Sequence, residues 1–119
     1  MRANLLKGSR DAAVKALAFE QIIAQAHPLA STAIEVIEGG RKVAGSATFQ
    51  AGLVELQDVA SQAVVETLAL RKGQRILDYC AGGGGKALAL AALADSAVDA
   101  WDSDAARMQD IAKRAERAG

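Results

Sequence analysis

Four consecutive glycines, Gly82–Gly85, restrict the fold of this chain more than any other feature of its sequence. Each glycine gives up much backbone freedom when it is ordered, so a run of four is expected where a backbone turns sharply or lies against a ligand. The run follows a short apolar strand at 75–79 and precedes a helix at 86–94. A second strand at 97–101 and a helix at 102–119 follow. This order predicts the opening of a doubly wound parallel sheet, an α/β fold.

The chain is expected to contain two regions. Residues 1–45 predict a small strand–helix–strand unit, with a strand at 1–6, a helix at 8–25, a second strand at 32–37 and a turn at 38–40. Residues 46–119 predict the partial sheet domain, which begins with a helix at 56–70. The residues predicted to face inward from the helices at 56–70 and 102–119 are Leu56, Val59, Ala60, Ala63, Val64, Leu68, Met108, Ile111, Ala112 and Ala115.

The composition argues against several classes of function. Lys plus Arg and Asp plus Glu each number 14, so the chain lacks the basic excess of a self-sufficient nucleic-acid-binding domain. No apolar run is long enough to cross a bilayer and no leader opens the sequence, so we expect a cytoplasmic protein with no membrane partner. The single cysteine, Cys80, excludes an internal disulfide and a multi-cysteine zinc site, and we expect no metal.

The glycine loop is compatible with three classes of nucleotide site. A phosphate loop of the G-x-x-x-x-G-K-[ST] type fits poorly, because Cys80 stands at its first glycine and Ala87 at its metal-binding hydroxyl. A dinucleotide fingerprint, G-x-G-x-x-A, is formally satisfied by Gly82, Gly84 and Ala87. Asp102 lies 20 positions after Gly82, where a carboxylate binds ribose hydroxyls. An S-adenosylmethionine (SAM) site would use the same loop and the same strand ends.

Asp78 favours SAM over a dinucleotide. Its carboxylate ends the first strand, just before the glycines. A dinucleotide would present an anionic pyrophosphate to this carboxylate, whereas SAM presents an ammonium and a sulfonium group. Alternatively, Asp78 only caps the loop or the helix, and the loop by itself leaves both interpretations open.

Three segments of the chain match the motifs of one enzyme family. The pattern F-x-x-G-x-x-x-x-Q-D-x-A-S-Q matches residues 49–62, L-D-x-C-A-A-P-G-G-K matches 77–86, and A-x-D-x-x-x-x-R-[LM] matches 100–108. The matching residues are Phe49, Gly52, Gln57, Asp58, Ala60, Ser61, Gln62, Leu77, Asp78, Cys80, Ala81, Gly84, Gly85, Lys86, Ala100, Asp102, Arg107 and Met108. By these motifs the chain resembles the Sun/nucleolar-protein family of RNA (cytosine-C5)-methyltransferases, whose bacterial branch methylates small-subunit ribosomal RNA.

The resemblance implies that this chain holds the opening half of a Rossmann-like, SAM-dependent methyltransferase sheet. Residues 1–45 would be an accessory unit that faces RNA, so Arg2, Lys7 and Arg10 belong either to an RNA-facing surface or to an ordinary solvated face. Gly82 and Gly83 replace the family's Ala-Pro, which makes the unbound loop more flexible. The implied cofactor-binding residues are Asp78, Cys80, Ala81, Gly82, Gly83, Gly84, Gly85, Lys86, Asp102 and Arg107.

The family's two catalytic cysteines lie in Pro-Cys and Thr-Cys-Ser motifs, and neither motif occurs in this sequence. By the resemblance, Cys80 lies at the cofactor loop, so we assign no catalytic residue. We therefore expect a fragment of the enzyme that is inactive alone. The alternatives are a catalytically inactive RNA-binding or assembly module and, less favoured, an NAD-binding unit. Two parallel strands leave an open sheet edge, so we expect either a longer parent protein or a homo-oligomer.

Overall fold

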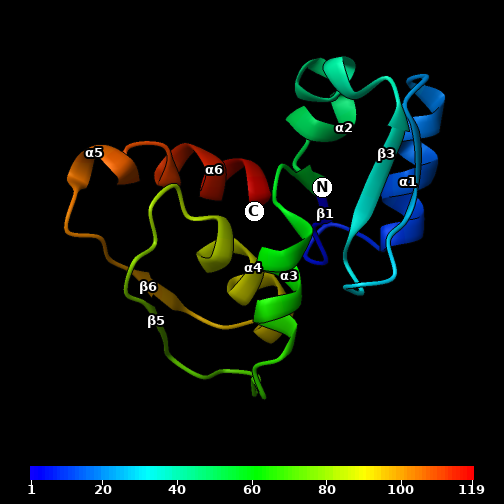
Figure 1. The fold of residues 1–119 in the computed structure, drawn as a ribbon. Helices are drawn as coiled ribbons and strands as arrows, with labels where there is room; N and C mark the ends of the chain where they lie inside the picture. Colours follow the sequence, from blue (N-terminus) through cyan, green and yellow to red (C-terminus); the bar gives the residue numbers. More distant parts are fainter.

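The chain folds into two small α/β bodies that lie side by side, as Figure 1 shows. The computed structural model describes residues 1–119. The strands form three two-stranded sheets, in which β1 pairs with β4 and β2 with β3 antiparallel, and β5 pairs with β6 parallel. The elements are β1 (Arg2–Ala3), α1 (Arg10–Phe19), β2 (Ile23–Ala26), β3 (Ile34–Glu38), the 3-10 helix η1 (Gly40–Gly45), α2 (Ala47–Gln50), β4 (Val54–Glu55), α3 (Val59–Glu66), β5 (Ile76–Asp78), α4 (Gly85–Ala94), β6 (Val98–Ala100), α5 (Ala105–Met108) and α6 (Ile111–Ala118).

Helix α1 ends earlier than the sequence predicts. It stops at Phe19 rather than near residue 25, because Gln21 adopts a left-handed conformation with φ 58°. The N–H of Gln21 donates to the carbonyl of Ala18, and the next N–H donates to the carbonyl of Leu17. These two bonds close the helix with a Schellman turn. Residues 23–26 therefore form β2, and the predicted strand–helix–strand unit is in fact a strand, a helix and a hairpin.

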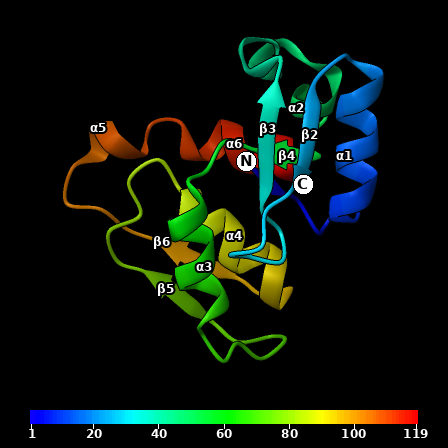
Figure 2. The same cartoon turned by 45° about the vertical axis from the view of Figure 1, so that its right-hand side comes forward.

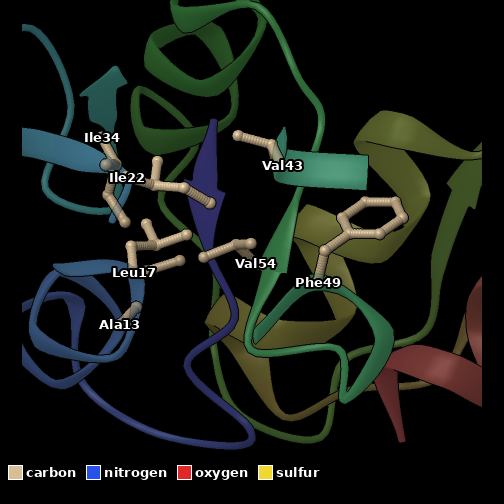
Figure 3. Packing of buried hydrophobic residues seen from close by; sticks show 8 residues of the cluster. Ala13, Leu17, Ile22, Ile34, Val43, Phe49 and Val54 are labelled. Carbon is tan, nitrogen blue, oxygen red and sulfur yellow. The ribbon is translucent and has the colours of Figure 1, made fainter. Parts of the chain in front are cut away.

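The first body is built on one hydrophobic core, shown in Figure 3. Leu17, Ile22 and Val54 are fully buried, and the burial of each stabilises the fold by roughly 1.5–3 kcal/mol. β1 is shorter than the predicted strand at 1–6, but it pairs with β4 on one side and is bridged to Ala33 on the other. Phe49 and Val54 share this core with residues before position 45. The division of the chain at residues 45 and 46 stays a prediction.

The second body contains the parallel strand pair that the sequence predicts. β5 and β6 pair in a register that places Ile76 opposite Val98. α4 begins within the glycine run and packs on one face of the pair, where Leu90 is buried together with Val65 of α3. In Figures 1 and 2, α3 and α4 lie on the same side of the two strands. The opposite face is uncovered, with exposed fractions of 61% for Leu77, 62% for Tyr79 and 44% for Trp101.

Helix α3 differs from the prediction in its length and in the face that it buries. It spans Val59–Glu66 rather than 56–70, and it buries Gln62 and Val65. Three members of the predicted apolar stripe are about half exposed, namely Leu56, Val64 and Leu68. Gln62 lies inward because its amide bridges two segments of the first body: Nε2 donates to the carbonyl of Met1 over 3.0 Å, and Oε1 accepts from the Thr32 hydroxyl over 3.2 Å. A polar side chain therefore takes the place that the prediction gave to aliphatic ones.

The predicted helix at 102–119 consists of two helices, α5 and α6, with an interruption at Gln109 and Asp110. Ala112, which the sequence predicts to face inward, is exposed. Arg114 and Arg117 of α6 are instead largely buried, with side chains 22% and 18% exposed. No helix of the structure is long and apolar enough to cross a membrane.

Candidate cofactor site at the glycine loop

The glycine loop and Asp102 meet where the carboxyl ends of β5 and β6 lie next to each other. Backbone pairing continues beyond the two strands. The N–H of Trp101 donates to the backbone carbonyl of Asp78 over 2.9 Å, and the N–H of Ala81 donates to the backbone carbonyl of Trp101 over 2.9 Å. The chain then turns through the glycines into α4. An open parallel sheet binds its ligands at the carboxyl ends of its strands, so the predicted residues are gathered where this fold usually binds a ligand.

Two glycines of the run adopt backbone conformations that other residues rarely take. Gly82 has φ 51° and Gly84 has φ 79°, and the N–H of Gly84 donates to the carbonyl of Ala81 over 2.8 Å. A Cβ on Gly84 would lie 2.9 Å from Cγ1 of Ile111 on α6. The glycines thus let the loop turn tightly beneath α6 and begin α4 without a side-chain cap. The first N–H groups of α4 lack partners within the helix and face this end of the sheet.

Asp102 is buried, and each of its two carboxylate oxygens accepts a backbone hydrogen bond. Its Oδ2 accepts from the N–H of Gly82 over 2.9 Å, and its Oδ1 accepts from the N–H of Asp104 over 3.0 Å. Nη1 of Arg107 lies 3.3 Å from Oδ2. The bonds from the backbone of Asp104 and Gly82, together with the Arg107 charge, hold the pKa of the Asp102 carboxyl below its ordinary value. Asp102 is therefore ionised at neutral pH, although its side chain is only 2% exposed.

Asp78 has an unsatisfied polar atom at the end of β5. Its Oδ2 is buried and has no hydrogen-bond partner. Such an acceptor costs free energy unless a donor reaches it. A cationic ligand with N–H groups would satisfy this oxygen, whereas an anionic group would not. The carboxylate at this position therefore fits the ammonium group of SAM and disfavours a pyrophosphate.

The other predicted cofactor residues differ in their exposure. Ala81 is buried, whereas the thiol-bearing residue Cys80 and the helix-start residue Lys86 are exposed. Tyr79 and Trp101 stack over the strand ends with ring centroids 4.5 Å apart and an interplanar angle of 15°. The stack lies on the face of β5 and β6 that α4 leaves uncovered, which is consistent with the exposure of both rings.

Of the three basic residues Arg2, Lys7 and Arg10, the structure buries only Arg2. Arg2 is buried, and its Nε donates to Oε1 of Gln57 over 2.8 Å. Nζ of Lys7 donates to the carbonyls of Ala51 and Arg117. Arg2 is therefore not part of an RNA-facing surface, and Lys7 is tied to backbone carbonyls.

Sequence reasoning missed three residues that contact the loop or support it. Nη1 of Arg114 donates to the carbonyl of Gly83, and Nε2 of Gln57 donates to the carbonyl of Gly85 over 3.1 Å. Glu55 is buried and pairs with Arg114. Gln57 belongs to the matched motif at residues 49–62, but the motif does not indicate which residue Gln57 contacts. Arg114 carries no local signal, because basic residues three positions apart on a helix usually form a solvated face.

The loop itself is an open surface rather than a deep cavity. The largest pocket, of about 470 Å³, contains no residue of the loop and is lined by Arg10, Ala26, His27, Pro28, Leu29, Ala30, Ser31 and Glu66. The structure brings together no group of three metal-ligating side chains. The site assignment therefore depends on the loop contacts and on Asp78 and Asp102.

Comparison with known proteins identifies relatives over the whole chain. No protein-family profile matches the sequence. The chain is 36% identical over 118 residues to ribosomal RNA small subunit methyltransferase B of Erwinia tasmaniensis, covering 98% of this chain and 27% of that protein. It is 31% identical over 121 residues to the probable ribosomal RNA small subunit methyltransferase B of Bacillus subtilis, covering 100% of this chain and 27% of that protein.

Two relatives named ribosomal RNA small subunit methyltransferase B thus align with nearly the whole of this chain. The resemblance drawn from the three motifs is thus confirmed, and the chain spans about a quarter of the length of these curated relatives. A solved structure of a methyltransferase homologue from Pyrococcus horikoshii matches with a TM-score of 0.88 and 26% identity, covering 99% of this chain and 39% of that one. A second solved structure matches with a TM-score of 0.89 and 25% identity. These matches confirm the partial Rossmann-like α/β fold.

Proposed function

We propose that this chain supplies the SAM-binding part of an RNA (cytosine-C5)-methyltransferase that acts on small-subunit ribosomal RNA. The observation that supports SAM best is the buried, unpartnered Oδ2 of Asp78 at the carboxyl end of β5. When bound, SAM supplies an electrophilic methyl group. The RNA substrate rests on the matched motifs and on the names of the relatives, and the C5 position rests on the motifs alone.

Each loop residue has a distinct role in this proposal. Asp78 binds the ammonium group, and the backbone of residues 80–86 lies along the methionine part of the cofactor. Asp102 accepts hydrogen bonds from the ribose hydroxyls. A carboxylate offers about four lone-pair positions. Since Gly82, Asp104 and Arg107 already approach Asp102, the ribose would share the carboxylate with them or displace Arg107. Lys86 adds positive charge at the start of α4.

The methyl-transfer step needs groups other than those at the loop. C5 of cytosine becomes nucleophilic only after a thiolate attacks C6, and that thiolate must be held beside the base. Cys80 is exposed at the cofactor loop, so we assign it no catalytic role. We propose that the catalytic thiols belong to other strands of the full enzyme. In the same proposal residues 1–45 are an accessory unit that faces RNA, and residues 46–119 are the partial methyltransferase domain.

Calorimetric titration of the folded chain with SAM and with NAD tests this proposal. We expect saturable binding of SAM and none of NAD. Asp78→Asn should weaken SAM binding, because the amide removes the charge that attracts the ammonium group. Asp99→Asn is the matched control, since Asp99 is an exposed carboxylate of β6 that pairs with Arg75 at the surface. Binding of NAD without SAM would restore the dinucleotide interpretation, and binding of neither would favour an RNA-binding or assembly module.

A further inference from the structure

The glycine run is held in place by contacts from outside the loop. The carbonyl of Gly83 accepts a hydrogen bond from Nη1 of Arg114 on α6. The N–H of the same peptide group belongs to Gly84 and donates to the carbonyl of Ala81. Both ends of this peptide group are therefore fixed, which sets the orientation of its plane in the middle of the run.

Glu55 holds the guanidinium of Arg114 in the orientation that reaches the loop. Its Oε2 accepts from Nε of Arg114 over 3.2 Å and from Nη2 over 2.8 Å. This leaves Nη1 on the opposite edge of the planar group, where it meets Gly83. Glu55 is only 2% exposed, and its other oxygen accepts from Nη2 of Arg117. A buried carboxylate that binds two guanidinium groups is a rigid anchor.

A second contact reaches the run from the same cluster. In the register of β1 and β4, Arg2 lies opposite Glu55. Nε of Arg2 donates to Gln57, and the amide nitrogen of Gln57 donates to the carbonyl of Gly85 over 3.1 Å. Burial lowers the pKa of Arg2 to about 10, with the nearby Glu55 charge opposing the shift, so Arg2 stays charged at neutral pH. The cluster therefore supports the run at two carbonyls.

We propose that Arg114, held by Glu55, is a positioning residue that keeps the glycine loop in its cofactor-binding conformation. Four glycines would otherwise lose much conformational freedom when a ligand binds. The contacts of Arg114 and Gln57, and that of Asp102 with the N–H of Gly82, fix the run before binding. The ligand part of this inference rests on the proposed SAM function, whereas the ordering of the loop does not.

The chain contains a matched pair of variants for the test. Arg114→Ala and Arg117→Ala each remove one ion pair with Glu55, but only the first releases the carbonyl of Gly83. Arg114→Lys is a milder third variant, because one ammonium group can pair with Glu55 but cannot also reach the loop as the planar fork does. It keeps the test valid if Arg114→Ala does not fold.

The first measurement is amide hydrogen exchange of Gly82 and Gly84 without ligand. We expect exchange about tenfold faster in Arg114→Ala and Arg114→Lys than in the unsubstituted chain, and little change in Arg117→Ala. The second is calorimetric SAM affinity, which should be about tenfold weaker in the two Arg114 variants and within about twofold of the parent in Arg117→Ala.

The two measurements separate the two proposals. Equal exchange at Gly82 and Gly84 in the Arg114 and Arg117 variants would overturn the positioning role, whatever SAM does. Faster exchange in the Arg114 variants, in a chain that binds no SAM, would support the positioning role and refute the proposed function. Faster exchange with unchanged SAM affinity would show that loop order does not matter for the cofactor, and would overturn that half of the inference.

Discussion

The backbone N–H of Gly82 donates a 2.9 Å hydrogen bond to Oδ2 of Asp102, 20 positions further along the chain. One carboxylate therefore ties the glycine loop to the carboxyl end of β6. The same oxygen lies 3.3 Å from Nη1 of Arg107 on α5. A change at Asp102 thus affects both the loop and the proposed ribose site.

Asp102→Asn should weaken SAM binding roughly tenfold or more, because hydrogen bonds to charged groups contribute more than those to neutral ones. The amide keeps the shape of the side chain, but its NH₂ group cannot accept from Gly82 or from Asp104. Calorimetric titration measures the effect. Asp95→Asn is the control, since Asp95 is an exposed carboxylate that pairs with Lys72 at the surface. Unchanged affinity in Asp102→Asn would remove Asp102 from the site.

Gly52→Ala should destabilise the fold far more than Gly73→Ala. Both glycines have positive φ, 73° and 78°, so alanine is strained at either position by about 1 kcal/mol. A Cβ on Gly52 would also overlap the carbonyl oxygen of Arg117, whereas nothing lies within 4 Å of a Cβ on Gly73. We expect a loss of roughly 3 kcal/mol or more for Gly52→Ala. Urea unfolding of the two variants measures the difference, and equal losses would contradict the close approach of α6.

Glu20 should make the first body sensitive to acid. The hydroxyl and N–H of Thr48 and the N–H of Ala47 donate to its carboxylate, and these bonds hold the pKa of Glu20 below its usual value of 4.5. Because the pKa of Glu20 is lower in the folded than in the unfolded state, its ionised carboxylate stabilises the fold. This stabilisation is complete above the unfolded-state pKa and is lost as the pH falls through the folded-state pKa.

Glu20→Gln should therefore reduce the free energy of unfolding at neutral pH and also reduce the further loss in acid. Urea unfolding at about pH 7 and about pH 3 tests both parts of this expectation. Asp11→Asn on α1 is a suitable control, because no hydrogen bond joins the side chain of Asp11 to another element. An acid-induced loss of the same size in Glu20→Gln and in the parent would refute this role.

The 119-residue chain should not methylate RNA by itself, even if it binds SAM. Its one thiol, Cys80, is exposed at the loop, and the transfer requires a thiolate beside the base. Incubation with radiolabelled SAM and unmodified ribosomal RNA should give no incorporation above background. Incorporation that disappears in Cys80→Ser would make Cys80 a nucleophile and overturn this expectation.

The uncovered face of β5 and β6 should lead either to self-association or to weak stability. Leu77, Tyr79 and Trp101 are exposed there, on a sheet with two open edges. Sedimentation across a range of concentrations should show an assembly that Leu77→Glu weakens. A monomer that unfolds cooperatively at high dilution would contradict the expectation.

The order of elements around the loop was predictable because its signals are local. The short apolar strands, the glycines and the acid after the second strand are read from neighbouring positions, and β5, α4 and β6 match them. The start of α1 near residue 8 was predictable for the same reason, and Ser9 caps it there by accepting from the N–H of Ala12. The end of α1 was not, because Gln21 takes a left-handed conformation where glycine usually signals the turn.

The supports of the loop could not be read from the sequence, because they join distant positions. Arg114 meets Glu55 across 59 positions, and Gln57 meets Arg2 across 55. Each of these side chains looks like a solvated residue within its own segment. Only the pairing of β1 with β4, and the approach of α6 to both, supplies the partners that make their burial favourable.

Trp101 is the only tryptophan of the chain, and it stacks on Tyr79 one residue before Asp102. The emission of an indole ring responds to the polarity and mobility of its immediate surroundings. Since the first body contains no tryptophan, the intrinsic fluorescence of this protein reports on the ends of β5 and β6 alone. The protein thus carries a fluorescent probe at the loop without any added label. Its signal does not report directly on changes in the hydrophobic core of the first body.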